Sequence, residues 1–159
     1  MVVSPRGLRF RGRVMPCVLG RGGVARAKRE GDGATPAGVH GIVSVLYRPD
    51  RVAPPCDWAM PLRRADLWSD DPADPGYNGL VRAPHPFSHE ALWRADPLYD
   101  VILVTDWNLA PARPGRGSAI FMHRWRRGGY PTAGCVALAP RDLGWIAARL
   151  APGARLCVP

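Results

Sequence analysis

The sequence has almost no lysine, no long apolar run and no closely spaced pair of cysteines. Lys28 is the single lysine, so 21 of the 22 basic residues are arginine, the side chain whose planar fork suits carboxylate and phosphate groups. No uninterrupted apolar run approaches the roughly 18 residues of a membrane-spanning helix, so no such helix is expected. The absence of a CxxC pair argues against a zinc site.

Positive charge is concentrated toward the two ends of the chain. The formal net charge is +9, and residues 1–30 and 101–159 are strongly basic, whereas residues 50–100 hold more acidic than basic side chains. This distribution predicts anionic partners. The sequence contains no zinc-finger spacing, no ribonucleoprotein-type aromatic motif and no basic helix, so nucleic-acid binding is not expected.

Length and composition predict one folded domain. The 159 residues, 47% of them apolar, suffice for one packed core, and we expect residues 1–159 to form a single domain. The first twenty residues scatter four arginines and two prolines among apolar residues, so no secretory signal is visible. Four cysteines would allow two disulfides in an oxidising compartment, namely Cys17, Cys56, Cys135 and Cys157.

Short β-like segments dominate the chain, separated by turns rich in Gly and Pro, which number 18 each. Apolar or alternating residues predict strands at 8–19, 39–48, 99–107, 118–122 and 154–158. Helices are predicted only at 88–95, with Ser88 as cap, and at 140–150, where apolar residues recur at helical spacing. These patterns favour a mainly β fold, either a sandwich or a barrel-like pair of sheets.

Two segments are expected to lack regular structure. Residues 20–38 contain six glycines and predict a turn-rich loop. Residues 49–75 contain six prolines and six aspartates, which disfavour both helix and sheet, so this segment is expected on the surface, as a loop or a cap.

One histidine and one cysteine stand twelve positions apart in AIFMHRWRRGGYPTAGCVAL, residues 119–138. His123 closes the strand predicted at 118–122, and a Gly-rich loop can return Cys135 toward it. An imidazole that takes the thiol proton, or stabilises the thiolate, makes cysteine nucleophilic. A turn at Gly134 would direct backbone N–H groups at an oxyanion. The alternative is a buried structural cysteine and a core histidine, which the spacing alone does not exclude.

This segment resembles the YkuD-type catalytic domain of L,D-transpeptidases, whose signature is a strand-end His followed by Ser/Thr-x-Gly-Cys. The matching residues are His123, Thr132, Gly134 and Cys135. KREGDGATPAGVHGI, residues 28–42, resembles the Gly-rich turn and Thr-Pro-x-Gly segment of that family. The run 99–120, which leads into the histidine, is similar as well, so the resemblance covers most of residues 17–150.

The resemblance implies a β-sandwich with one or two short helices and a capping element over its cleft, for which 49–75 is the candidate. Cys135 would be the nucleophile, His123 the general base, and the backbone around Gly134 part of an oxyanion hole. The substrate would be a peptidoglycan stem peptide, whose acyl group passes through a cysteine thioester to an amine of diaminopimelate. No metal or organic cofactor is implied, and the expected location is the periplasm or cell envelope.

The chain departs from the family pattern beside the cysteine. Ala133 and Ala137 stand where the family usually has His and Arg, so another cation is expected near the site. The candidates are Arg124, Arg126, Arg127 and Arg141.

Further side chains are predicted to contact the substrate. Thr132 and Tyr130 lie in the loop before the cysteine, as does Trp125, and His40 follows the Thr-Pro-x-Gly match. The histidines outside the motif show no metal-ligand spacing.

The strings GDGATP and PTAGCVAL are similar to those of a proteobacterial subgroup associated with 1-3 crosslinks, in which the donor is attacked at its first residue. The 1-3 reaction is therefore favoured over the 3-3 reaction. Three alternatives stay open: hydrolysis by an L,D-carboxypeptidase or amidase, exchange of a terminal D-amino acid, and a non-catalytic module that binds the anionic cell wall through its basic surface.

Overall fold

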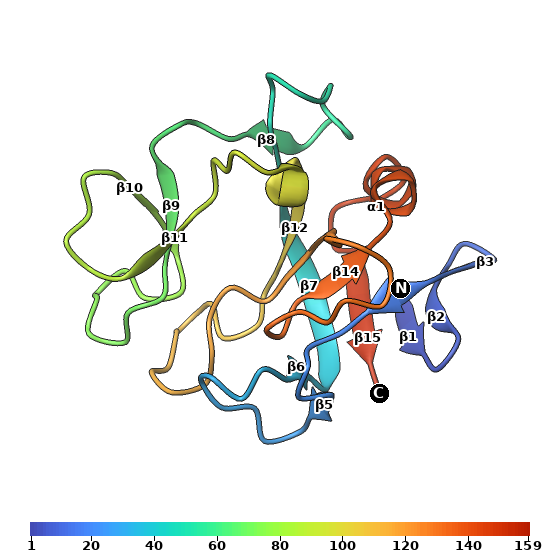
Figure 1. Cartoon of the computed structure of the whole chain (residues 1–159), viewed down its shortest axis with the longest axis horizontal. Coiled ribbons are helices and arrows are strands. Elements are labelled where there is room, and N and C mark those ends of the chain that lie inside the picture. Colours follow the sequence, from blue (N-terminus) through green and yellow to red (C-terminus); the bar gives the residue numbers. More distant parts are fainter.

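Figure 1 shows the computed structural model, which describes all residues from 1 to 159. Its helices are α1 (Pro140–Ala147) and the short 3₁₀ helix η1 (Pro97–Tyr99), and neither is long and apolar enough to cross a membrane. The remaining regular structure consists of short strands: β1 (Val2–Ser4), β2 (Gly7–Phe10), β3 (Arg13–Met15), β4 (Cys17–Val18), β5 (Val24–Ala25), β6 (Thr35–Pro36), β7 (Gly38–Tyr47), β8 (Ala59–Pro61), β9 (Asp66–Ser69), β10 (Leu80–Arg82), β11 (His89–Ala91), β12 (Val101–Thr105), β13 (Phe121–Arg124), β14 (Val136–Leu138) and β15 (Arg155–Val158).

One large sheet forms the centre of the fold, in the order β3-β2-β1-β15-β7-β12-β13-β14-β4, with β8 beside β7. The end strand β4 contacts β2 near the other end, so the sheet almost closes on itself. Side chains on its inner face build the main core, among them Leu8, Val45, Leu103, Val136 and Leu156, because successive residues of a strand point to opposite faces. The predicted mainly β, sandwich-like fold is confirmed.

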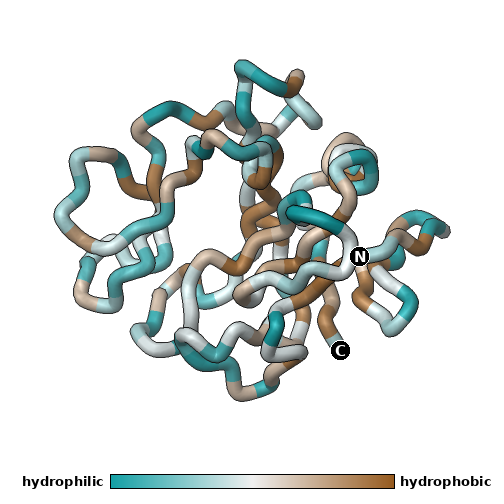
Figure 2. The backbone as a smooth tube through the Cα atoms, in the orientation of Figure 1, coloured by the Kyte–Doolittle hydropathy of each residue, from teal (hydrophilic) through white to brown (hydrophobic).

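Hydropathy follows this architecture (Figure 2). Apolar residues concentrate in the strands of the large sheet, and hydrophilic residues dominate the surrounding loops. Helix α1 adds Leu143, Ile146 and Ala147 to the same core, at the spacing that places them on one helix face. The helix predicted at 140–150 is confirmed, with its end at Ala147.

A smaller sheet, in the order β10-β9-β11, stands beside the large one (Figure 1). It contributes Trp68 and Leu92 to a second apolar cluster, in which the ring of Trp68 meets Phe121 of β13 edge-on, with 4.9 Å between centroids. This cluster attaches the small sheet to the large one. It therefore fixes the polar side chains at the ends of β9 and β11 relative to β13.

The Pro-rich segment 49–75 is not one continuous loop. Its first half joins the large sheet, since β8 pairs with β7, and Trp58 packs against the main core and donates from its indole N–H to the Leu150 carbonyl at 3.2 Å. Its second half begins the small sheet, which ends only at Ala91. The element in the position of a cap is thus the sheet of residues 66–91; that it acts as a cap stays a prediction.

Two predicted elements require correction. Residues 88–95 are not a helix: His89–Ala91 form β11 and pair with β9, because that pairing satisfies the backbone and buries Leu92, and tertiary packing overrides a local capping signal. The strand predicted at 118–122 starts at Phe121, since Ala119 has a φ of +52°, which a strand does not accommodate. His123 consequently lies within β13 rather than closing an earlier strand.

Candidate active site

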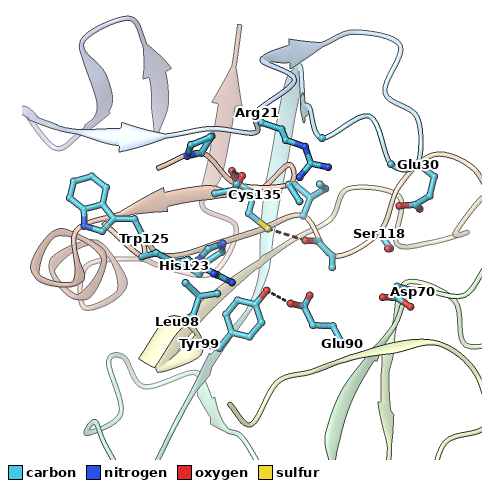
Figure 3. Close-up of a pocket in the computed structure, with 18 of the residues that line it drawn as sticks. Arg21, Glu30, Asp70, Glu90, Leu98, Tyr99, Ser118, His123, Trp125 and Cys135 are labelled. Atoms are coloured by element: carbon cyan, nitrogen blue, oxygen red, sulfur yellow. Dashed lines mark hydrogen bonds between the residues drawn. The ribbon is translucent and has the colours of Figure 1, made fainter. Parts of the chain in front are cut away.

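A pocket of about 800 Å³ opens between the large sheet, the small sheet and the glycine-rich loop that follows β4. Cys135 and His123 both line it, and Figure 3 shows their side chains close together at its centre. The pocket is of the size that binds small organic ligands and short peptides.

Sheet pairing brings the cysteine and the histidine together. Strands β13 and β14 are parallel neighbours, with Met122 opposite Val136 and His123 opposite Ala137. Cys135 immediately precedes β14 and therefore lies beside the beginning of β13. Its Sγ donates to the carbonyl of Ala119 at 3.1 Å and lies 3.4 Å from the backbone nitrogen of Phe121, whose N–H points at the sulfur.

The imidazole of His123 is held in one orientation. Its Nδ1 lies 2.7 Å from the carbonyl oxygen of Arg124, which can only accept, so Nδ1 carries the proton and Nε2 is left as the basic nitrogen. The ring packs edge-on against Tyr99 of η1, with 5.3 Å between centroids. His123 can therefore act as a base through Nε2.

Burial favours the uncharged form of both groups. Desolvation lowers the pKa of His123 to about 4, and the same effect raises the pKa of the Cys135 thiol to about 12. The resting pair is a thiol beside a neutral imidazole. An attack by Sγ would therefore require the thiol proton to be removed as the attack occurs.

Alkylation of Cys135 by iodoacetamide tests this resting state. Because only the thiolate reacts, a pKa of about 12 predicts slow alkylation at pH 7 and a rise of about tenfold per pH unit up to pH ~10. Peptide-resolved mass spectrometry across this range measures the rate, with the protein unfolded in urea as the control in which the cysteine has an ordinary pKa. A rate that levels off below about pH 8 would contradict the neutral pair and indicate a thiolate at rest.

The turn before the cysteine is organised by Thr132. Its hydroxyl donates to the carbonyl of Cys135 at 2.6 Å and accepts from the N–H of Gly134 at 3.1 Å. Gly134 has a φ of +146°, and a Cβ there would lie 2.9 Å from the carbonyl oxygen of Ala34, so only glycine fits. The N–H of Gly134 already donates to Thr132, whereas the N–H of Cys135 makes no hydrogen bond within the protein. The N–H of Cys135 is therefore the better oxyanion donor.

The structure places some predicted substrate residues in the pocket and others outside it. Those that line it are Thr132, Tyr130, Trp125 and Arg126. Arg124 instead faces Asp100 at 3.8 Å, and Arg127 lies over the Tyr130 ring. Arg141 is an exposed residue of α1.

His40 does not reach the pocket, contrary to its prediction. It lies buried on β7, where its Nε2 is 3.0 Å from the Pro36 carbonyl and its ring meets Trp107 edge-on. His40 pairs with Leu156 of β15, and in the sheet β7, β12 and β13 separate β15 from β14, the strand that follows Cys135. His40 is therefore a structural histidine.

Sequence reasoning missed several charged residues that line the pocket. The cations are Arg21 and Lys28, and the acids are Glu30, Asp70 and Glu90. Arg21 is brought there because the chain after β4 runs alongside Thr132, with the Arg21 N–H donating to the Thr132 carbonyl at 2.9 Å. A strand predicted at 88–91 would have placed Ser88 and Glu90 on the same face of the sheet, because alternate residues of a strand point to one side.

A buried asparagine supports Ala119, whose carbonyl accepts the hydrogen bond from the Cys135 thiol. The Asn78 side-chain oxygen accepts from the N–H of Ala119 at 2.9 Å and from the indole of Trp68 at 3.0 Å. Its amide nitrogen donates to the carbonyls of Trp107 and Asn108 at 3.0 and 2.8 Å. Asn78 thus joins the small sheet to the loop that carries Ala119.

Lys28, the single lysine, is buried beside the same pocket. Its Nζ lies 2.7 Å from Asp32 Oδ1 and 2.6 Å from the carbonyl oxygen of Arg29. Across the whole chain, no group of three His, Cys, Asp or Glu side chains is arranged to hold a metal ion.

This arrangement defines the class of site: a cysteine thiol and a histidine imidazole in one pocket with charged walls of both signs. The chain belongs to the YkuD family of L,D-transpeptidase catalytic domains, whose family model matches residues 5–158. Among solved structures, an L,D-transpeptidase from Mycobacterium smegmatis is similar, at 14% identity and a TM-score of 0.42 over 92% of this chain and 48% of that one. This chain therefore spans about half the length of that protein. None of the curated proteins gives a significant match.

Proposed function

We propose that the protein is a peptidoglycan L,D-transpeptidase that works through a thioester on Cys135. The proposal rests on family membership and on one observation. The thiol of Cys135 shares a pocket with an imidazole whose Nδ1 is held by the Arg124 carbonyl, so that Nε2 is free to accept the thiol proton. Because peptidoglycan lies outside the cytoplasm, the proposed location is the periplasm.

The first half of the reaction acylates the cysteine. A donor amide enters with its carbonyl carbon next to Sγ; as the S–C bond forms, the thiol proton moves to His123 Nε2 and the carbonyl oxygen becomes an oxyanion. The N–H of Cys135 is placed to stabilise that oxyanion. Collapse breaks the C–N bond, and the proton on Nε2 passes to the leaving amine.

The second half transfers the acyl group. An amine of diaminopimelate attacks the thioester carbonyl, its N–H proton moves to His123 Nε2, and the thiolate leaves and takes that proton from Nε2. Water in place of the amine would give hydrolysis. The outcome depends on which nucleophile the pocket places beside the thioester.

The cations of the pocket fit an anionic donor. Arg21 and Arg126 lie on its walls, and arginine pairs well with carboxylates. Arg21 would supply the positive charge of the arginine that the family usually has at the position of Ala137. We favour attack at the first donor residue, which gives 1-3 crosslinks. The resemblance of GDGATP and PTAGCVAL to the 1-3 subgroup supports this choice, and a pocket of about 800 Å³ has room for a leaving group of several residues.

Incubation with defined diaminopimelate-containing muropeptides tests the function, with Cys135→Ala as the variant that lacks the nucleophile. Mass spectrometry with fragmentation should find dimers made only by the unmodified protein and joined through the first donor residue. Dimers joined through the third residue would replace 1-3 by 3-3 crosslinking. Shortened monomers alone would identify a hydrolase, and the absence of any Cys135-dependent product would favour the binding module.

A further inference from the structure

The pocket holds a carboxylate that the reaction described so far does not use. Glu90 of β11 lines the pocket with Cys135 and His123, and its Oε1 accepts a hydrogen bond from the Tyr99 hydroxyl at 2.7 Å. Tyr99 in turn packs against the ring of His123. In Figure 3 the Glu90 side chain lies on the opposite side of Cys135 from Arg21.

The acyl acceptor must lose a proton before it can attack, and a carboxylate in the pocket can take that proton. An aliphatic amine with a pKa of about 10 arrives at pH 7 as an ammonium ion, which has no lone pair for attack. His123 receives only the proton that the amine loses during attack. A second base is needed for the proton that the ammonium carries into the pocket.

We propose that Glu90 binds the ammonium group of the acyl acceptor and removes its extra proton. This inference rests on the proposed function. The proton moves from nitrogen to the Glu90 carboxylate, which gives a neutral amine and a carboxylic acid. The amine then attacks the thioester, its next N–H proton goes to His123 Nε2 and from there to the departing sulfur, and Glu90 returns its proton to solvent.

The surroundings of Glu90 suit both binding and proton uptake. Partial burial raises the pKa of Glu90, which makes it a stronger base than a surface glutamate. Arg94 faces Oε1 at a distance of 3.9 Å, and Asp70 and Asp96 add negative charge around it. Glu90 and Cys135 line the same pocket, and the charge of Glu90 adds to the dominant effect of burial in raising the pKa of the thiol.

A second carboxylate on the same wall points to a cationic ligand. The backbone of Asp70 pairs with Ser88, so β9 and β11 direct Asp70, Ser88 and Glu90 into the pocket together. The buried oxygen Oδ1 of Asp70 has no hydrogen-bond partner in the protein. Asp70 thus adds a second negative charge to the wall that holds Glu90, which favours a cationic ligand.

Glu90→Gln tests the assignment, because glutamine still accepts from the Tyr99 hydroxyl but cannot take a proton. Acylation of Cys135 by a donor muropeptide, followed by intact-protein mass spectrometry, should stay within about twofold of the unmodified protein. At pH 7 the ratio of dimer to hydrolysed donor should fall about tenfold or more. That ratio should recover as the pH approaches the pKa of the free amine, about 10.

Two controls separate proton removal from positioning. Hydroxylamine, which is largely uncharged at pH 7, should accept the acyl group equally well from the Glu90→Gln variant and the unmodified protein. Tyr99→Phe removes the hydrogen bond but keeps the carboxylate, so it should change the partition between amine and water far less than Glu90→Gln does. If Glu90→Gln and Tyr99→Phe changed the partition equally, the assignment would be overturned in favour of a positioning role. The same would follow if Glu90→Gln lost as much acyl transfer to hydroxylamine as to the amine of diaminopimelate.

The failure of this inference is distinguishable from the failure of the proposed function. Normal acylation with an unchanged partition in Glu90→Gln would overturn only the role of Glu90. No acylation of Cys135 in the unmodified protein would overturn the transpeptidase and, with it, the role of Glu90.

Discussion

Replacing His123 with glutamine is expected to slow acylation of Cys135 about 10²- to 10⁴-fold, the usual contribution of a general base. The thiol is protonated at rest, since burial raises its pKa to about 12, so attack requires a group that takes the proton. His123 lines the pocket with the thiol, and its Nε2 is the ring nitrogen left free to accept the proton, because Nδ1 is held by the Arg124 carbonyl. Single-turnover acylation by a donor muropeptide, followed by intact-protein mass spectrometry, measures the effect.

The pH dependence gives a second readout for the same substitution. Burial lowers the pKa of His123 to about 4, so the imidazole is a neutral base above that pH and becomes protonated below it. Acylation by the unmodified protein should therefore fall only as the pH drops through about 4, and this acid limb should be absent from His123→Gln.

His40→Gln is the matched control for His123. It makes the same change at another buried histidine bonded to a backbone carbonyl, outside the pocket. Its acylation rate should stay within a few-fold of that of the unmodified protein. Equal losses in the two variants would show that a general loss of structure, and not loss of the base, slows the reaction.

Asn78→Ala is expected to lower the free energy of unfolding by roughly 2–6 kcal/mol, because it leaves two buried N–H donors unpaired at about 1–3 kcal/mol each. These donors are the backbone N–H of Ala119 and the indole of Trp68. Asn78 is only 2% exposed, so water cannot readily replace its amide. Urea unfolding followed by tryptophan fluorescence measures the loss.

Asn108→Ala provides the comparison. Asn108 also has a positive φ and three side-chain hydrogen bonds, but it lies in a partly exposed loop, where water can satisfy the groups left behind. Its loss should be clearly smaller than that of Asn78. Equal losses in the two variants would contradict a special role for the buried asparagine.

The pairing of Cys135 with His123 could be recognised from the sequence because its signal is local. Thr132, Gly134 and Cys135 fall within four residues, since one turn must satisfy the Gly134 N–H and present the thiol. His123 precedes this turn within the same segment because adjacent parallel strands carry the two groups. The mainly β fold was predictable for a similar reason, since alternation along each strand records which face is buried.

The walls of the pocket could not be predicted, because contacts between distant segments create them. Arg21 reaches the pocket through the pairing of the chain after β4 with Thr132, more than a hundred residues later. Glu90 lines the pocket only because β11 pairs with β9, whereas its local sequence suggests a helix. His40 shows the reverse error: a histidine near a motif in sequence is directed away by its strand.

For the acyl-transferring enzyme that we propose, the burial of Lys28 has a consequence. A lysine side chain on its own surface would compete with diaminopimelate and become a site of self-modification. The one lysine is buried at the pocket wall, and its ammonium is paired with Asp32, whereas the guanidinium groups of the 21 arginines are poor nucleophiles. The chain thus combines a net charge of +9 with a single lysine whose ammonium is engaged by Asp32, so the proposed acyl-enzyme would meet little competition from its own side chains.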